Sequence, residues 1–193
     1  MVVTKGKQFL GYDLSDPVQL KKFETHLFNE VRSGKTFKEA LQLSDGLIEQ
    51  LYSLAYNLYT QGRYPDSITV FKLLVFLDPM SFRYQFGLAA CMQLIEEYME
   101  AVRYYSLAAL IEKDNPLPEY YGGECLLRLK KKGLALQAFQ VAILKAKGKP
   151  EYQKIAQRAE MLRDAISEDV RAYIKKESPA AKASSGKKTA KKK

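Results

Sequence analysis

Histidine and cysteine, which often serve as nucleophiles, general bases and metal ligands, are scarce in this chain. His26 is the single histidine, and Cys91 and Cys125 are the only cysteines. Nucleophilic catalysis requires a thiol or hydroxyl beside a matched base, and a zinc site requires several Cys or His ligands at short spacing. The sequence also lacks a P-loop and a paired dinucleotide-binding glycine motif. We therefore expect neither an enzyme nor a binder of a metal or cofactor.

The spacing of the two cysteines points to an internal repeat instead. Cys91 and Cys125 are 34 residues apart, and the same step relates other positions of similar type. Small residues and aromatic residues recur in phase through three copies, and such a period is typical of stacked helical hairpins. The columns are Ala55, Ala89 and Gly123; Ser67, Ala101 and Ala135; and Phe71, Tyr105 and Phe139.

This pattern resembles the tetratricopeptide repeat, in which two helices approach each other closely at the small residues. Gly62 is suited to the left-handed turn that ends the first helix of copy one, and Pro79 stops the second helix. The fold class is predicted to be all-α, with three hairpins in a right-handed superhelix. The predicted segments are a flexible arm over 1–15, an N-terminal helical cap over 16–46, three repeats over 47–149, a C-terminal capping helix over 150–176 and a disordered Lys-rich tail over 177–193.

The net charge of +9 belongs mainly to the C-terminal tail. Residues 178–193 hold six lysines and no acidic residue, which leaves 25 basic and 22 acidic residues in the rest of the chain. So small an excess does not predict a nucleic-acid surface on the fold. Binding of RNA or another polyanion by the tail remains an alternative to a merely solubilising terminus. With two cysteines and no apolar run of about 18 residues, we expect a cytoplasmic protein that does not insert into membranes.

The first helix of each repeat should line the concave side of such a stack. Residues at its second, fifth, ninth and twelfth positions are predicted to face a groove. This face is mostly aromatic and aliphatic, which favours binding of apolar side chains from an extended peptide. The alternative is that the same side chains pack against the N-terminal helix or a dimer partner. The predicted groove residues are Tyr52, Tyr56, Tyr59, Arg83, Phe86, Gln93, Leu117, Tyr120, Tyr121, Glu124 and Leu127.

One kind of tetratricopeptide site is excluded by the residues at its positions. Domains that bind the C-terminal carboxylate of heat-shock chaperones need Lys, Asn and Arg in the groove, because a carboxylate is held by charge-assisted hydrogen bonds. The corresponding positions here are Tyr52, Tyr56, Gly87, Leu117 and Tyr121. None of them supplies a cation.

The chain between about residues 34 and 145 resembles the class II chaperones of bacterial type III secretion. The stretches that carry the resemblance are Leu51–Tyr56, Gly62–Tyr64, Leu77–Pro79, Phe86–Cys91 and Glu124–Leu127. The resemblance implies a chaperone that keeps hydrophobic translocator proteins soluble by binding an extended segment near their N-terminus, and that often forms homodimers. It assigns client binding to Tyr52, Tyr59 and Phe86. The Lys-rich tail and the missing turn glycine of copy three depart from the family pattern.

A generic tetratricopeptide adaptor for folded partners is the main alternative function. Such an adaptor would use an edge or outer surface and would not need a hydrophobic client. Co-expression with a translocator would separate the two hypotheses, because only a chaperone should rescue the solubility of the client.

Overall fold

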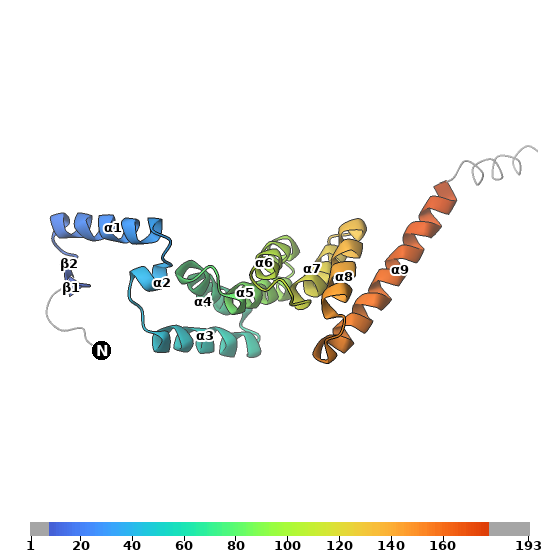
Figure 1. Cartoon of the computed structure of the whole chain (residues 1–193), viewed down its shortest axis with the longest axis horizontal. Coiled ribbons are helices and arrows are strands. Elements are labelled where there is room, and N and C mark those ends of the chain that lie inside the picture. Colours follow the sequence, from blue (N-terminus) through green and yellow to red (C-terminus); the bar gives the residue numbers. More distant parts are fainter. Residues whose placement is uncertain (1–7, 178–193) are drawn as a thin grey trace, which may run out of the picture. The chain divides into compact units, whose positions relative to one another are not determined.

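The computed structural model describes residues 8–177, with side chains over residues 8–168. The chain forms two compact units, Met1–Ile95 and Glu96–Lys193. Apart from one two-stranded hairpin, the regular structure of the described part is helical (Figure 1). The predictions for residues 1–7 and for the Lys-rich tail over 178–193 concern residues that lie outside this part.

The described part of the first unit contains two short strands and five helices. They are β1 (Gln8–Phe9), β2 (Tyr12–Asp13), α1 (Pro17–Arg32), α2 (Phe37–Ala40), α3 (Asp45–Thr60), α4 (Tyr64–Leu77) and α5 (Phe82–Leu94). α3 and α4 pack together as a hairpin, and α5 packs against α4. α1 contacts β2 and α2.

The flexible arm predicted over 1–15 is wrong for residues 8–13, which form an antiparallel β-hairpin. Leu10 and Gly11 both adopt positive φ angles, of 50° and 84°, as a tight hairpin turn requires. The hairpin is attached to α1 by aromatic contacts, since the Tyr12 ring lies 5.7 Å from Phe23 and 6.0 Å from His26. Periodicity could not predict so short an element, because its stability comes from this packing.

The helical cap begins where the sequence predicts. The Asp16 carboxylate accepts a hydrogen bond from the backbone N–H of Val18 at 2.9 Å, so it is the N-cap of α1. Thr36 and Glu39 form a capping box around the first turn of α2. Within the predicted cap over 16–46, α2 ends at Ala40, and Gln42 adopts a φ of 50°.

The core of the first unit is built at the repeat's small and aromatic positions. Ala55 of α3 and Ser67 of α4 are fully buried, and the Ser67 hydroxyl donates to the Ala55 carbonyl at 2.8 Å. This contact requires the two helices to lie close together, which larger side chains would prevent. Phe71 and Leu88 fill the layer between α4 and α5.

The second unit consists of helices stacked in sequence order. They are α6 (Tyr98–Ile111), α7 (Leu117–Arg128), α8 (Lys132–Ala146), a 3₁₀ turn η1 (Pro150–Tyr152) and α9 (Gln153–Glu177). α7 packs on α6 and α8, and α9 packs on α8. Gly123 permits this packing, because a β-carbon there would lie 2.8 Å from the Phe139 ring. The capping helix predicted from residue 150 begins with the 3₁₀ turn η1 and continues as α9.

The turn that follows the first helix of each repeat has the same backbone in all three copies. Gly62, Glu96 and Lys130 are spaced 34 residues apart and adopt φ angles of 76°, 65° and 59°. Gly62 confirms the predicted left-handed turn. Copy three keeps the turn without its glycine, because Lys130 takes the left-handed conformation instead.

Candidate peptide-binding pocket

Three tyrosines form one wall of a pocket in the first unit. Tyr52, Tyr56 and Tyr59 lie on successive turns of α3, because residues three and four apart share a helix face. The rings of Tyr52 and Tyr56 are stacked at 6.4 Å, and those of Tyr56 and Tyr59 at 6.2 Å. Tyr56 is 51% exposed, so this wall is partly open to solvent.

The opposite wall comes from α5. Phe82 and Phe86 are stacked at 5.3 Å, four residues apart on one face of the helix. Between the two walls lies a pocket of about 380 Å³. Its lining also includes Ala90 and Phe71 of α4, against whose ring Gly87 lies closely because it has no side chain.

Arg83 supplies the cation of this pocket, and its charge is already paired. Its Nη2 and Nη1 groups donate to the two carboxylate oxygens of Glu49 at 2.8 and 3.2 Å. Its guanidinium also lies 3.8 Å from the centroid of the Tyr52 ring, which is a cation–π arrangement. The Glu49 hydrogen bonds raise the pKa of Arg83, and the Arg83 guanidinium lowers the pKa of Glu49.

This geometry is suited to holding an apolar side chain. Apart from Arg83, the lining is aromatic or small, and the Arg83 charge is paired with Glu49 across α3 and α5. Tyrosine rings offer apolar area at one end and a hydroxyl at the other, so they can pack against a side chain while hydrogen-bonding a backbone. The pocket therefore fits an extended peptide with an apolar anchor better than a charged metabolite.

In the first unit, five of the six predicted groove residues meet at this pocket. They are Tyr52, Tyr56, Tyr59, Arg83 and Phe86. The sixth, Gln93, lies half-buried near the end of α5 and is not part of the pocket lining.

In the second unit, the assignment of Tyr120 to an open groove is wrong. Tyr120 is only 3% exposed and belongs to the core cluster with Phe139 of α8 and Ala159 and Ile166 of α9. Its hydroxyl donates to Glu124 at 2.7 Å. The stacking of α9 on α8 and α7 buries this position.

The other predicted groove residues of the second unit are all half-buried. Tyr121 and Leu127 pack against the same core cluster, and the Tyr121 ring lies 5.1 Å from that of Tyr120. Leu117 begins α7, and Glu124 accepts the Tyr120 hydrogen bond. None of these four residues belongs to the lining of the pocket between α3 and α5.

Comparisons with known proteins agree with the repeat and identify its family. Residues 48–80 match the tetratricopeptide repeat model. The chain is 30% identical over 146 residues to low calcium response locus protein H of Yersinia pseudotuberculosis, which covers 76% of this chain and 87% of that protein.

Two crystal structures of the Yersinia enterocolitica type III secretion chaperone SycD are also similar. The first is a complex with a peptide of the translocator YopD (33% identity, TM-score 0.64), and it covers 66% of this chain and 97% of SycD. The second, described as an alternative dimer, has 32% identity and a TM-score of 0.62 and covers 70% of this chain and 98% of SycD.

The chain belongs to the translocator chaperones of type III secretion. This confirms the family predicted from the repeat stretches and the all-α tetratricopeptide fold class. Sequence reasoning about this chaperone missed Phe71, Phe82 and Gly87 as pocket residues. Phe71 belongs to the repeat column of aromatic residues. The spacing of Phe82 and Phe86, four residues apart, is a sequence signal that places both on one helix face.

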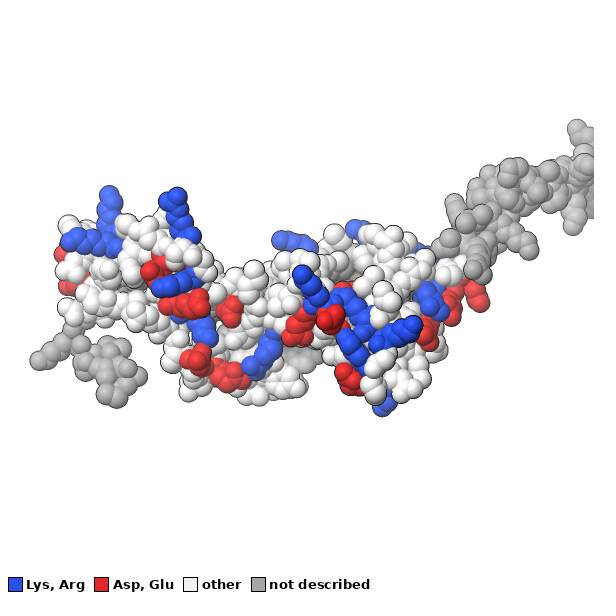
Figure 2. All heavy atoms as spheres, in the orientation of Figure 1, with Lys and Arg blue, Asp and Glu red and all other residues white. Residues whose placement is uncertain are grey.

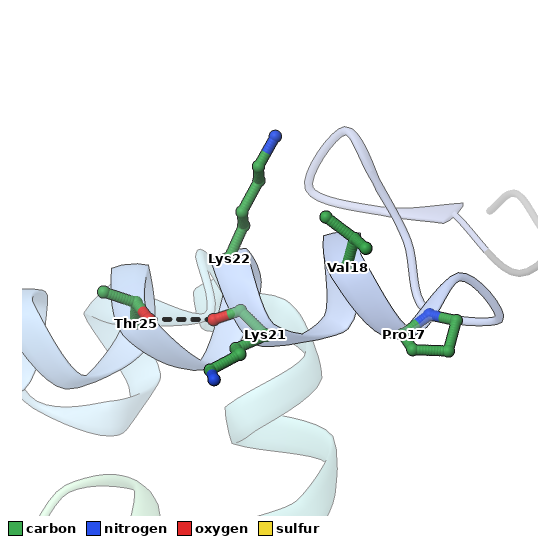
Figure 3. Close-up of a pocket in the computed structure, with 5 residues that line it drawn as sticks. All are labelled: Pro17, Val18, Lys21, Lys22 and Thr25. Atoms are coloured by element: carbon green, nitrogen blue, oxygen red, sulfur yellow. Dashed lines mark hydrogen bonds between the residues drawn. The ribbon is translucent and has the colours of Figure 1, made fainter.

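A second hollow of the chaperone lies along α1 (Figure 3). Pro17, Val18, Lys21, Lys22 and Thr25 line about 450 Å³, and all of them come from one helix. The Thr25 hydroxyl donates to the Lys21 carbonyl within this helix at 2.8 Å. Because all of its lining residues come from α1, this hollow lacks the two opposed walls that α3 and α5 give the other pocket.

Charge and metal chemistry do not suggest a different site. Figure 2 shows basic and acidic side chains interspersed on the visible face of each unit. Among the described residues of the chaperone, no group of three or more His, Cys, Asp or Glu is placed to hold a metal ion. Within the same part, no helix is long and apolar enough to cross a membrane.

Proposed function

We propose that this chaperone binds an extended segment of a hydrophobic translocator in the pocket between α3 and α5. The observation that carries the proposal is the convergence of five predicted groove side chains on one aromatic pocket. The related chaperone SycD forms a complex with a translocator peptide, which supports the same class of ligand here. Holding such a segment keeps the client soluble and competent for secretion.

The pocket would act by burying an apolar anchor of the client between the rings of Tyr52 and Phe86. Each buried Leu- or Pro-sized side chain contributes about 1.5–3 kcal/mol, and ordering of the peptide offsets part of this gain. The tyrosine hydroxyls would satisfy polar groups of the client backbone. Since Glu49 pairs the charge of Arg83, the anchor should be uncharged.

The setting that we infer is the bacterial cytoplasm, before export of the client. Membership of a chaperone family supports a binding role rather than an enzymatic one. The dimer described for SycD supports a homodimer of this chain as well.

The proposal is tested by co-expression of the full chain with a hydrophobic translocator of a type III secretion system. We expect the double variant Tyr52→Ala/Phe86→Ala to lose client co-purification while keeping its helical circular dichroism. Leu54→Ala is the matched control, because Leu54 is an exposed α3 residue outside the pocket lining. Undiminished client recovery with the double variant would exclude this pocket as the site. Clients that are already soluble without the chain would instead favour a generic adaptor.

A further inference from the structure

Glu49 and Arg83 occupy the same position of two successive repeats. They are 34 residues apart, on α3 and α5, and stacking of the repeats brings them side by side. The third copy has Leu117 at this position, so the series of charged residues ends there. The ion pair is therefore a feature of the first unit, at the pocket that Arg83 helps to line.

The pair should contribute little to the stability of the fold. The side chains of Arg83 and Glu49 are 50% and 57% exposed, and exposed ion pairs are weakened by water and salt. The two hydrogen bonds have a different consequence. Because both join the planar guanidinium to one carboxylate, they fix the orientation of the guanidinium as well as its position. Arg83 is thereby held over the ring of Tyr52, 3.8 Å from its centroid.

The ring of Tyr52 has two further contacts, both with core residues. Phe71 meets it edge-on, with 6.1 Å between the ring centroids and 75° between the planes. The Tyr84 ring lies 6.0 Å away. Phe71 and Tyr84 are 2% and 6% exposed, whereas Arg83 is half exposed. Arg83 is thus a contact of this ring that can be removed without opening the core.

The order of the Tyr52 ring bears directly on the affinity of the pocket. Tyr52 is half-buried and belongs to the pocket lining. A side chain that is free to change rotamer loses this freedom when a ligand packs against it, and the lost entropy weakens binding. A ring that is already fixed in the free chain avoids this cost. A cation–π contact of the kind that Arg83 makes is strong enough to favour one ring position.

We propose, on the basis of the function assigned to the pocket, that Arg83 is a positioning residue, which Glu49 orients and which fixes the ring of Tyr52 to receive the apolar anchor of the client. Arg83 acts through Tyr52 and not by neutralising a carboxylate of the client, because its charge is already paired within the chain. Lysine cannot replace it, since an ammonium group has neither the fork that matches a carboxylate nor the plane that stacks on a ring.

The first test uses the free chain, so it does not depend on the client. In NMR spectra with ¹³C-labelled tyrosine, nuclear Overhauser contacts between the rings of Tyr52 and Phe71 should weaken in Arg83→Gln. The midpoint of urea unfolding should stay close to that of the parent chain. Arg103→Gln is the matched control, because Arg103 is a 70% exposed member of an ion pair on α6, and it should change neither measurement. Unchanged ring contacts in Arg83→Gln would overturn the proposal.

The second test is a double-mutant cycle with a fluorescein-labelled peptide of the translocator YopD, the kind of ligand found with SycD. Fluorescence anisotropy should show that Arg83→Gln and Glu49→Gln bind it about three- to tenfold more weakly than the parent chain. In a Tyr52→Ala background, Arg83→Gln should cause no further loss, because the ring that it positions is absent. Arg83→Lys keeps the charge without the fork and should also bind more weakly than the parent chain.

Two results of this cycle would overturn the positioning role alone. An equal loss from Arg83→Gln in the parent and Tyr52→Ala backgrounds would show that Arg83 contacts the client directly. Full affinity in Arg83→Lys would show that the charge suffices. Equal peptide binding by the parent chain and by Tyr52→Ala/Phe86→Ala would instead refute the function proposed for the pocket, and this proposal with it.

Discussion

Gly87 of α5 lies directly against the ring of Phe71 on α4. A β-carbon at Gly87 would be 2.5 Å from two ring atoms of Phe71, closer than real β-carbons approach other atoms. Phe71 is 2% exposed and forms part of the pocket lining. The absence of a side chain at position 87 therefore sets both the spacing of the two helices and the depth of the pocket.

Substitution Gly87→Ala should destabilise the first unit and distort the pocket together. Overpacking of a filled core costs about 1–3 kcal/mol, and the displaced Phe71 ring would enter the pocket. Urea unfolding measures the first effect, and client co-purification measures the second. Gly46→Ala is the control, since a β-carbon there meets nothing within 4 Å. A Gly87→Ala protein as stable as the parent chain would show that Phe71 has room to move.

The Glu49–Arg83 pair predicts that the stability of the first unit depends on pH. Hydrogen bonds from Arg83 lower the pKa of Glu49 below its ordinary value of 4.5. The folded-state pKa is lowered, so the pair stabilises the fold above pH 4.5 and this contribution is lost as the pH falls through the lowered pKa. An NMR titration should find the Glu49 pKa below 4.5 in the parent chain and close to 4.5 in Arg83→Gln. Identical titration curves in the two proteins would contradict the pairing.

The repeat could be predicted from sequence because its signal is distributed over many columns. Small and aromatic residues at Ala55, Ser67 and Phe71 must recur wherever two helices meet in the same way. The pocket of the first unit was predictable for the same reason, since Tyr52, Tyr56 and Tyr59 occupy one helix face.

What could not be predicted depends on packing between elements distant in sequence. Tyr120 stands at the repeat position of Phe86, yet α9 buries it, and no residue of α7 signals this cover. The β-hairpin is stabilised by ring contacts of Phe9 and Tyr12 with Phe23 on α1. The turn of copy three persists at Lys130, where the backbone N–H groups of Lys130 and Lys131 donate to carbonyls at the end of α7.

The left-handed backbone at Lys130 predicts that Lys130→Gly stabilises the protein. A non-glycine residue in the left-handed region is disfavoured by about 1–2 kcal/mol, and the greater entropy of glycine in the unfolded chain offsets about half of the gain. We expect a net stabilisation of up to about 1 kcal/mol in thermal or urea unfolding. Gly62→Ala, at the same position of copy one with a φ of 76°, should change stability in the opposite direction. Destabilisation by both substitutions would show that Lys130 is held by contacts of its side chain.

The two buried cysteines should be unreactive until the protein unfolds. Cys91 and Cys125 are both fully buried. Burial raises the pKa of Cys91, and burial with the nearby Glu124 raises the pKa of Cys125 to about 12. Because thiolates are the reactive form, iodoacetamide labelling near neutral pH should follow the unfolding transition in urea.

The raised pKa of Cys125 also determines how the stability of the fold changes with pH. Between the ordinary value of 9.0 and about 12, the unfolded chain loses the Cys125 proton while the folded chain keeps it. Stability should therefore fall as the pH rises through this window. A Cys125→Ala variant should lose less stability over the same range. Labelling of the native chain as fast as a free thiol would contradict the burial of both groups.

Substitutions at Tyr120 test whether this residue acts in the core or in client binding. Its ring is buried among α7, α8 and α9, and its hydroxyl donates to Glu124 at 2.7 Å. Tyr120→Ala should cost about 3–5 kcal/mol, as truncation of other buried aromatics does, whereas Tyr120→Phe should cost about 1 kcal/mol for the lost hydrogen bond. Since Tyr120 lies outside the pocket of α3 and α5, Tyr120→Phe should leave client co-purification unchanged. A loss of client binding in Tyr120→Phe at unchanged stability would return this residue to the binding surface and require α9 to move aside when the client binds.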